Sequence, residues 1–161
     1  MKKKFLNAKI YRNDSATEMI VENGKISQIG TNLFKCDEEI DLNGKLVLPP
    51  YVDPHLHLDY VYTLSELGQE GAGSGTLFEA IELWPQFKKT LTIESVKRLA
   101  MKGIKDEVSQ GVQHIRTHID VTDPNFTALK AMLEMKQDLK DIVDIQIVAF
   151  DHLIFVQLLY N

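Results

Sequence analysis

The 161-residue sequence predicts an α/β fold in which a small β-sheet region precedes alternating strands and helices. Two observations carry this prediction. Asn-Gly pairs punctuate short apolar runs in the first fifty residues, as they do in tight hairpins. After residue 49 the pattern changes to apolar runs separated by amphipathic segments, which is typical of βαβ units on a parallel sheet. We therefore expect a β subdomain over 1–48 and β/α units over 49–150.

The N-terminal region is expected to contain two β-hairpins. Each is predicted from an Asn-Gly pair, because these residues adopt the positive φ angles of a two-residue type I′ turn. The two turns fall at 23–24 and 43–44. The strands that they would join are 19–22 with 25–29, and 39–42 with 45–48.

Three helices are expected after residue 49. The first begins near Thr76 and is kinked or ended by Pro85. The second is better marked, with Thr92 as its N-cap and Gly111 at its end. The third has Asp123 as its N-cap, followed by a proline in the first turn. Its expected core stripe consists of Leu129, Met132, Leu133, Lys136 and Leu139.

Polar and apolar side chains alternate along three predicted strands. Period two places each set on its own face. A half-solvated antiparallel sheet would alternate in the same way, but the intervening helices favour a parallel sheet whose apolar face they cover. The other face would then form a polar interior. Its side chains are Asp53, His55 and His57; His114, Arg116, His118 and Asp120; and Asp144, Gln146, Val148 and Phe150.

The composition disfavours some binding partners and cellular locations. The formal net charge of −5 disfavours a nucleic acid or an anionic membrane surface, which would require a basic surface. No run of residues approaches the roughly 18 apolar residues of a membrane-spanning helix. The lone Cys36 cannot form an internal disulfide, which fits a reducing, cytoplasmic compartment.

The most informative motif is a His-x-His in residues 49–59, which read Pro-Pro-Tyr-Val-Asp-Pro-His-Leu-His-Leu-Asp. On a strand, His55 and His57 point the same way, about 6.6 Å apart along the backbone. Two such imidazoles can bind one divalent ion at metal–nitrogen distances near ~2.1 Å. An isolated pair would more often lie on a solvated strand face. Here an apolar run at 46–48 leads into it, which indicates a buried strand that ends in a polar mouth.

These residues resemble the amidohydrolase superfamily, whose first barrel strand ends in a Pro-x-His-x-His signature. Within that superfamily the sequence is most similar to the bacterial cytosine deaminase branch. The resemblance ends at Phe150, where that branch continues with Pro-Gln and this chain has a different tail over 151–161. The segments that carry the resemblance are 48–59, 74–79, 111–120, 128–134 and 144–150.

The resemblance implies a metal-dependent hydrolytic deaminase that converts cytosine and water into uracil and ammonia. It implies a TIM-like (β/α) barrel, of which this chain carries about three of the eight units. The implied cofactor is one divalent ion, zinc or iron, with His55 and His57 as two of its ligands. The family takes its other ligands and its proton-shuttling glutamate from later strands. We therefore expect the 161-residue chain to bind metal weakly or not at all, and to be inactive alone.

The resemblance also bears on substrate binding. It implies a pyrimidine or related heterocycle as substrate and allows a homo-oligomer in the complete enzyme. Leu77 matches a position whose backbone carbonyl contacts the pyrimidine, although a leucine there also suits a helix packed on the core. His152 replaces the family's substrate-reading glutamine, so the recognition of cytosine is expected to change.

Two further residues are candidates for a supporting role. His118 and Asp120 face the predicted polar interior and are expected to support the metal site through hydrogen bonds. The alternative for His118 is a core histidine with satisfied hydrogen bonds.

Alternatives remain open at this stage. The chain could belong to another amidohydrolase, acting on a related heterocycle or an N-substituted amine, or it could be a nonenzymatic remnant or a binding module. The tail over 151–161 has neither strand alternation nor a polar turn. We expect it to be translated in a shifted reading frame, with Pro-Gln resuming in another frame of the DNA downstream.

Overall fold

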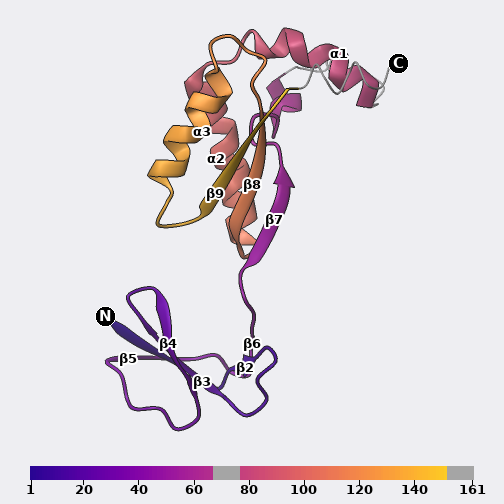
Figure 1. The fold of residues 1–161 in the computed structure, drawn as a ribbon. Helices are drawn as coiled ribbons and strands as arrows, with labels where there is room; N and C mark the ends of the chain where they lie inside the picture. The colour runs from indigo at the N-terminus through magenta and orange to yellow at the C-terminus, as the bar shows by residue number, and fades with distance from the viewer. Residues whose placement is uncertain (67–76, 152–161) are drawn as a thin grey trace. The chain divides into compact units, whose positions relative to one another are not determined.

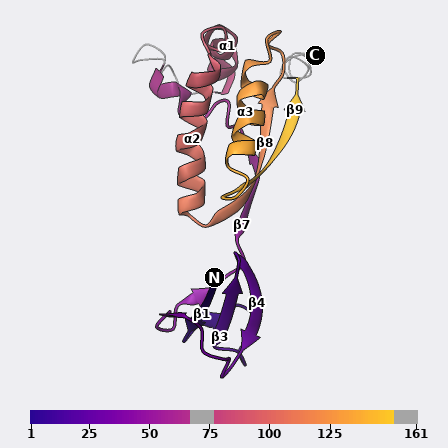
Figure 2. The ribbon, with the colours of Figure 1, turned by 90° about the vertical axis from the view of Figure 1, so that its left-hand side faces the viewer.

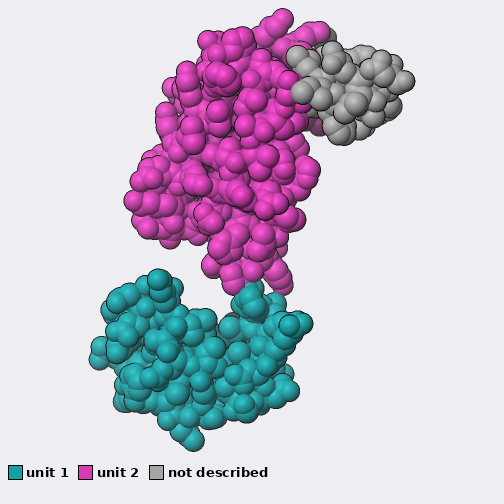
Figure 3. Space-filling model, in the orientation of Figure 1, with its two compact units in different colours: residues 1–49 teal, residues 50–161 magenta. Residues whose placement is uncertain are grey.

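The computed structural model describes residues 1–66 and 77–151. Thr76 and His152, on which two of the predictions above depend, lie outside these ranges, as does nearly all of the predicted tail. The chain divides into two compact units, Met1–Pro49 and Pro50–Asn161 (Figure 3). Each unit has its own sheets, and each is described by itself below.

The first unit is built from short strands (Figure 1). One sheet has the order β4-β3-β1-β5, and a second sheet consists of β2 and β6. β1 runs antiparallel to β3 and parallel to β5. The strands are β1 (Lys2–Leu6), β2 (Lys9–Ile10), β3 (Glu18–Glu22), β4 (Lys25–Gly30), β5 (Glu38–Asp41) and β6 (Leu46–Val47).

The first predicted hairpin is confirmed. β3 and β4 pair antiparallel, with Glu22 opposite Lys25. The turn residues Asn23 and Gly24 have φ angles of 51° and 77°, which is the positive-φ pair that a type I′ turn needs.

The second predicted hairpin is wrong. Asn43 and Gly44 do form a turn with positive φ, but β5 pairs with β1 while β6 pairs with β2. The reason is a neighbouring bend at Asn7, whose carbonyl accepts a hydrogen bond from the Gly44 N–H at 2.7 Å. The bend at Asn7, between β1 and β2, lies beside the turn at Asn43 and Gly44, between β5 and β6. β5 therefore pairs with β1 before the two bends, and β6 pairs with β2 after them.

The second unit contains a parallel sheet of order β7-β8-β9. Helices separate its parallel strands along the chain, so the predicted α/β fold is confirmed and the antiparallel alternative is wrong for these strands. Its described elements are β7 (Tyr51–Leu56), the 3₁₀ helix η1 (Thr63–Glu66), α1 (Leu77–Lys88), α2 (Ile93–Ser109), β8 (Val112–Asp120), α3 (Thr127–Asp138) and β9 (Asp144–Phe150).

The core lies between this sheet and two helices, because α2 and α3 cover the same face (Figures 1 and 2). Along β8 the side chains of Ile115, Thr117 and Ile119 are buried, whereas His114 and Arg116 are exposed. The predicted alternation is thus present from His114 to Thr117, whereas Asp120, expected on the polar face, is buried. The core also includes Leu58, Val96, Ala100, Ile104, Ala131, Met132, Met135 and Ile145.

Helix α2 follows the sequence signals closely, whereas α1 departs from them at Pro85. α1 continues through Pro85 to Lys88, so the proline does not end it. α2 begins with a capping box in which the Thr92 hydroxyl accepts a hydrogen bond from the Ser95 N–H, and Gly111 follows it with a φ of 92°. Within the described part of the chain, no helix has both the length and the apolar character needed to cross a membrane.

The predicted start of α3 is wrong by several residues. Its N-cap is Phe126, with a φ of 51°, and not Asp123. The Asp123 carboxylate accepts hydrogen bonds from the N–H groups of Asn125 and Thr127, at 3.0 and 2.9 Å. Such local bonds stabilise a turn in competition with a helix, so the first turn is delayed.

The buried face of α3 also differs from the predicted stripe. Leu133 is exposed, whereas Ala128 and Ala131 are buried. The buried face of α3 is therefore shifted from the predicted stripe by about one residue toward the N-terminus. Its buried members are Ala128, Ala131, Met132 and Met135.

Loss of the Thr92 hydroxyl should destabilise the second unit. We expect Thr92→Ala to lower the free energy of unfolding by about 1 kcal/mol, because a first-turn N–H of α2 loses its acceptor. Thr92→Ser keeps the hydroxyl and is the matched control. Urea unfolding followed by circular dichroism measures both, and equal stability of the two variants would contradict the role of the cap.

Candidate metal and substrate site

The backbone around the two histidines departs from a regular strand. Pro54 has no N–H to give to a neighbouring strand, and the register between β7 and β8 shifts between Asp53 and Leu56. The His55 N–H instead donates to the Asp53 carboxylate at 2.9 Å. β7 ends at Leu56, so His57 lies just beyond it. Strict strand alternation is therefore not what orients the pair.

The two imidazoles nevertheless meet. The Nε2 atoms of His55 and His57 lie 3.3 Å apart, and their ring centroids are 5.3 Å apart. Two nitrogens that each stand ~2.1 Å from one ion at a tetrahedral angle are about 3.4 Å apart. The donor set therefore fits two positions around one divalent ion.

Further rings surround the pair. His118 of β8 stacks on His55, with centroids 4.1 Å apart and an interplanar angle of 26°. The Phe150 ring meets His57 edge-on at 5.3 Å, and the Tyr60 ring lies 5.2 Å from His57. Burial lowers the pKa of His118, with His55 and Arg116 adding to the shift and a hydrogen bond to the Leu56 backbone opposing it. Among the described residues, no group of three His, Cys, Asp or Glu side chains is placed to hold an ion.

Two side-chain hydrogen bonds hold the segment after His57 against β8. The Leu58 N–H donates to the Thr117 hydroxyl at 3.0 Å, and the Asp120 N–H donates to the Asp59 carboxylate at 2.9 Å. Asp59 is only 3% exposed, and this burial raises its pKa to about 7. The chain thus leaves β7 along a fixed path.

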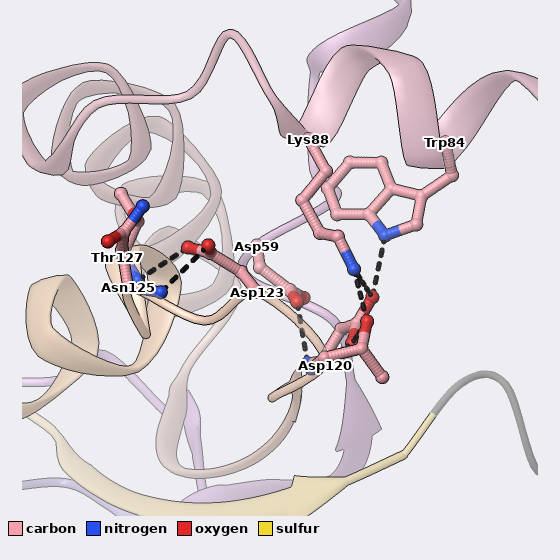
Figure 4. Close-up of polar contacts among 8 residues, drawn as sticks. Asp59, Trp84, Lys88, Asp120, Asp123, Asn125 and Thr127 are labelled. Carbon is pink, nitrogen blue, oxygen red and sulfur yellow. Dashed lines mark hydrogen bonds and ion pairs between the residues drawn. The ribbon is translucent and has the colours of Figure 1, made fainter.

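The Asp120 carboxylate is the centre of a buried polar cluster (Figure 4). It accepts hydrogen bonds from Trp84 Nε1 at 2.9 Å, from Lys88 Nζ at 3.0 Å and from the Thr122 N–H at 2.8 Å. Burial alone would raise the pKa of Asp120, but the hydrogen bonds from Thr122, Trp84 and Lys88 outweigh it and lower the pKa. In the described residues its hydrogen-bond donors are thus Trp84, Lys88 and Thr122, and not a histidine.

The cluster fixes the helix that carries the predicted substrate contact. Leu77 is the first residue of α1, about two turns before Trp84. Sequence reasoning missed Trp84 and Lys88, although their i, i+4 spacing places them on one helix face. A pocket of about 250 Å³ adjoins the cluster. It is lined by Trp84, Pro85, Lys88, Lys89, Asp120, Thr122, Asp123 and Pro124.

Removal of the Asp120 charge should destabilise the second unit. We expect Asp120→Asn to lower the free energy of unfolding at pH 7 by about 2 kcal/mol, because hydrogen bonds to a charged group are lost around the half-buried Lys88. The lowered pKa means that Asp120 stabilises the fold above the unfolded value of roughly 4, and that this contribution is lost as the pH falls through the folded pKa.

The difference between wild type and Asp120→Asn should therefore shrink below about pH 4. Urea unfolding at a series of pH values measures it, with the exposed Asp141→Asn as control. A difference that stayed constant down to pH 2 would show that the Asp120 charge is not the cause.

The comparison with known proteins finds relatives, although no family model matches the chain. The chain is 34% identical over 148 residues to N-isopropylammelide isopropyl amidohydrolase of Pseudomonas sp. strain ADP, a match covering 89% of this chain and 37% of that protein. It is 32% identical over 143 residues to the dihydroorotase of Lactobacillus acidophilus, covering 81% and 32%.

Solved structures give the same result. 5-Methylcytosine deaminase from Klebsiella pneumoniae, liganded with 5-fluorocytosine, matches with a TM-score of 0.77 and 40% identity, covering 91% of this chain and 36% of that one. N-isopropylammelide isopropylaminohydrolase from Burkholderia multivorans, at 23% identity and a TM-score of 0.75, shares the fold over 94% of this chain and 38% of that one. The chain thus spans a little over a third of the length of these proteins. Its homologues and structural neighbours are amidohydrolase-family members, which confirms the resemblance identified from the sequence.

Proposed function

We propose that this chain supplies three adjacent β/α units and two metal ligands of a hydrolytic deaminase acting on a cytosine-like heterocycle. The observation that carries the proposal is the 3.3 Å approach of the His55 and His57 Nε2 atoms. The 40% identity to 5-methylcytosine deaminase over 91% of the chain supports this substrate class.

A partial (β/α) barrel explains where the polar side chains lie. β7, β8 and β9 are parallel, and helices α2 and α3 cover one face of their sheet. In such barrels the functional groups gather at the carboxyl ends of the strands. His57, Asp120 and Phe150 each stand at or just beyond the end of their strand. The opposite, polar face of the sheet would then line the barrel interior.

In this proposal His55 and His57 hold the ion through Nε2, which requires the proton of each neutral ring to be on Nδ1. The ion, zinc or iron, supplies the activation of water at neutral pH when it is bound. The hydrogen bonds accepted by the Thr117 hydroxyl and the Asp59 carboxylate hold the segment after His57 against β8. The Asp120 cluster holds α1, so that the Leu77 carbonyl can contact the heterocycle.

A second substrate class has its own support. The 34% identity to N-isopropylammelide isopropyl amidohydrolase covers 89% of the chain, which favours cleavage of an N-substituted amine from a related ring. Both candidates use hydrolysis of a carbon–nitrogen bond. They differ in the group that leaves.

Metal binding by the isolated chain tests the ligand assignment. We expect weak or substoichiometric binding of Zn²⁺, because two imidazoles are fewer than the three protein ligands of a typical catalytic site. His55→Ala and His57→Ala should each remove it. Calorimetric titration and metal analysis after dialysis measure this, with the exposed His114→Ala as control. One tightly held ion that persists in the double variant His55→Ala/His57→Ala would refute the assignment.

A chimera tests the reaction. Residues 1–150 of this chain replace the matched segment of Klebsiella pneumoniae 5-methylcytosine deaminase, and a second chimera is made in the same way in the Pseudomonas N-isopropylammelide enzyme. We expect the first to retain more of its host's activity than the second, as measured by ammonia or amine release. His55→Ala should abolish the activity that remains. Retention only in the second chimera would favour the N-substituted amine, and a folded but inactive pair would contradict the proposal.

A further inference from the structure

The candidate metal ligands are surrounded by rings from two neighbouring strands. His118 stands in β8 and Phe150 at the end of β9. Parallel pairing sets Asp120 opposite Phe150, so the two rings come from adjacent strands near the same edge of the sheet. Their centroids are 6.5 Å apart, with an interplanar angle of 74°. The His118 ring stacks on His55 and also lies 5.7 Å from the His57 ring, at a tilt of 40°, whereas the Phe150 ring meets His57 edge-on.

The ring geometry separates His118 from the two ligands. An imidazole binds a metal through a lone pair in the plane of its ring. His118 lies almost parallel to His55, at 26° and 4.1 Å, so it presents its face to the His55 ring. His118 therefore contacts His55 through its ring face, and among the described residues no third ligand is placed beside the pair.

A histidine side chain needs such a contact to hold its orientation. The last torsion of histidine is broad, so the ring of an exposed histidine such as His55 has no fixed orientation without a contact. Rotation would move Nε2 away from its partner and lose the 3.3 Å spacing that fits one ion. A flat ring stacked on one face limits this rotation.

We propose that His118 is a positioning residue of the metal site, which orients His55 by stacking while Phe150 orients His57 by an edge contact. This inference rests on the proposed function, since it concerns the ion that His55 and His57 would bind. It differs from the hydrogen-bonding role expected from the sequence. What matters is a flat side chain at position 118, and not its nitrogens.

Two substitutions in the full 161-residue chain separate these roles. His118→Phe keeps a flat ring without nitrogens, whereas His118→Ala removes the ring. Aromatic pairs contribute enough free energy that His118→Ala should weaken Co²⁺ binding roughly threefold to tenfold. His118→Phe should bind within about twofold of wild type. Titration with a competing chromophoric chelator measures both affinities, and the visible absorption of bound Co²⁺ reports the ligand set.

The control is His114→Ala, an exposed histidine on the same face of β8, which should leave affinity unchanged. His118→Leu replaces the alanine variant if circular dichroism shows that the latter is unfolded. Equal losses in the Phe and Ala variants, with an altered Co²⁺ spectrum, would make His118 a ligand and overturn the proposal. Unchanged affinity in His118→Ala would overturn it alone. No binding by the wild type would overturn this role, because the pair would hold no ion for His118 to support, whereas the proposed function is tested separately by the chimera.

Discussion

The candidate site depends on the hydrogen bonds that join the end of β7 to β8. Pro54 and the shifted register weaken the backbone ladder between these strands where the histidines lie. Side chains join the two strands there instead. The Thr117 hydroxyl accepts a hydrogen bond from the Leu58 N–H, and the Asp59 carboxylate accepts one from the Asp120 N–H. Both acceptors are buried, and a buried polar group left without its partner costs about 1–3 kcal/mol. The path of the chain after His57 is therefore strongly specified.

At the end of β8, an ion pair between Asp120 and Lys88 joins the sheet to α1. Asp59 and Asp120 are neighbouring buried carboxylates, and Lys88 supplies the one positive charge that pairs with Asp120 in the described structure. Burial raises the pKa of Asp59 to about 7, and the Asp120 charge adds to this shift, whereas hydrogen bonds lower the pKa of Asp120. At neutral pH Asp120 is thus the firmly ionised member. Since buried ion pairs pay a desolvation penalty, the cluster contributes more to the position of α1 than to net stability.

Much of the second unit could be predicted from its sequence, because its signals are local. Thr92 and Gly111 bound α2 through the geometry of its own ends. Alternation along β8 follows from one face being covered by helices. The failures arose where a competing partner decided the outcome. The turn at Asn43 formed as expected, but the bend at Asn7 determined which strands pair on either side of it.

Partners distant in the sequence explain what was missed at the site. Trp84 and Asp120 are 36 residues apart in the sequence, and no local sequence pattern predicts the hydrogen bond between them. The spacing of His55 and His57 did predict that the two rings meet, which the structure shows. It gave an incomplete reason, because β7 ends before His57 and its register is irregular.

The orientation of the histidine pair is thus a property of three strands and not of the motif alone. The His-x-His supplies two nitrogens, whereas the rings that face them come from β8 and β9. A chain could keep the motif and lose the orientation if His118 or Phe150 changed to a side chain without a flat ring. Both rings are present here, at a stacking distance from His55 and an edge distance from His57. Flanking strands therefore carry information about such a site that the short motif does not contain.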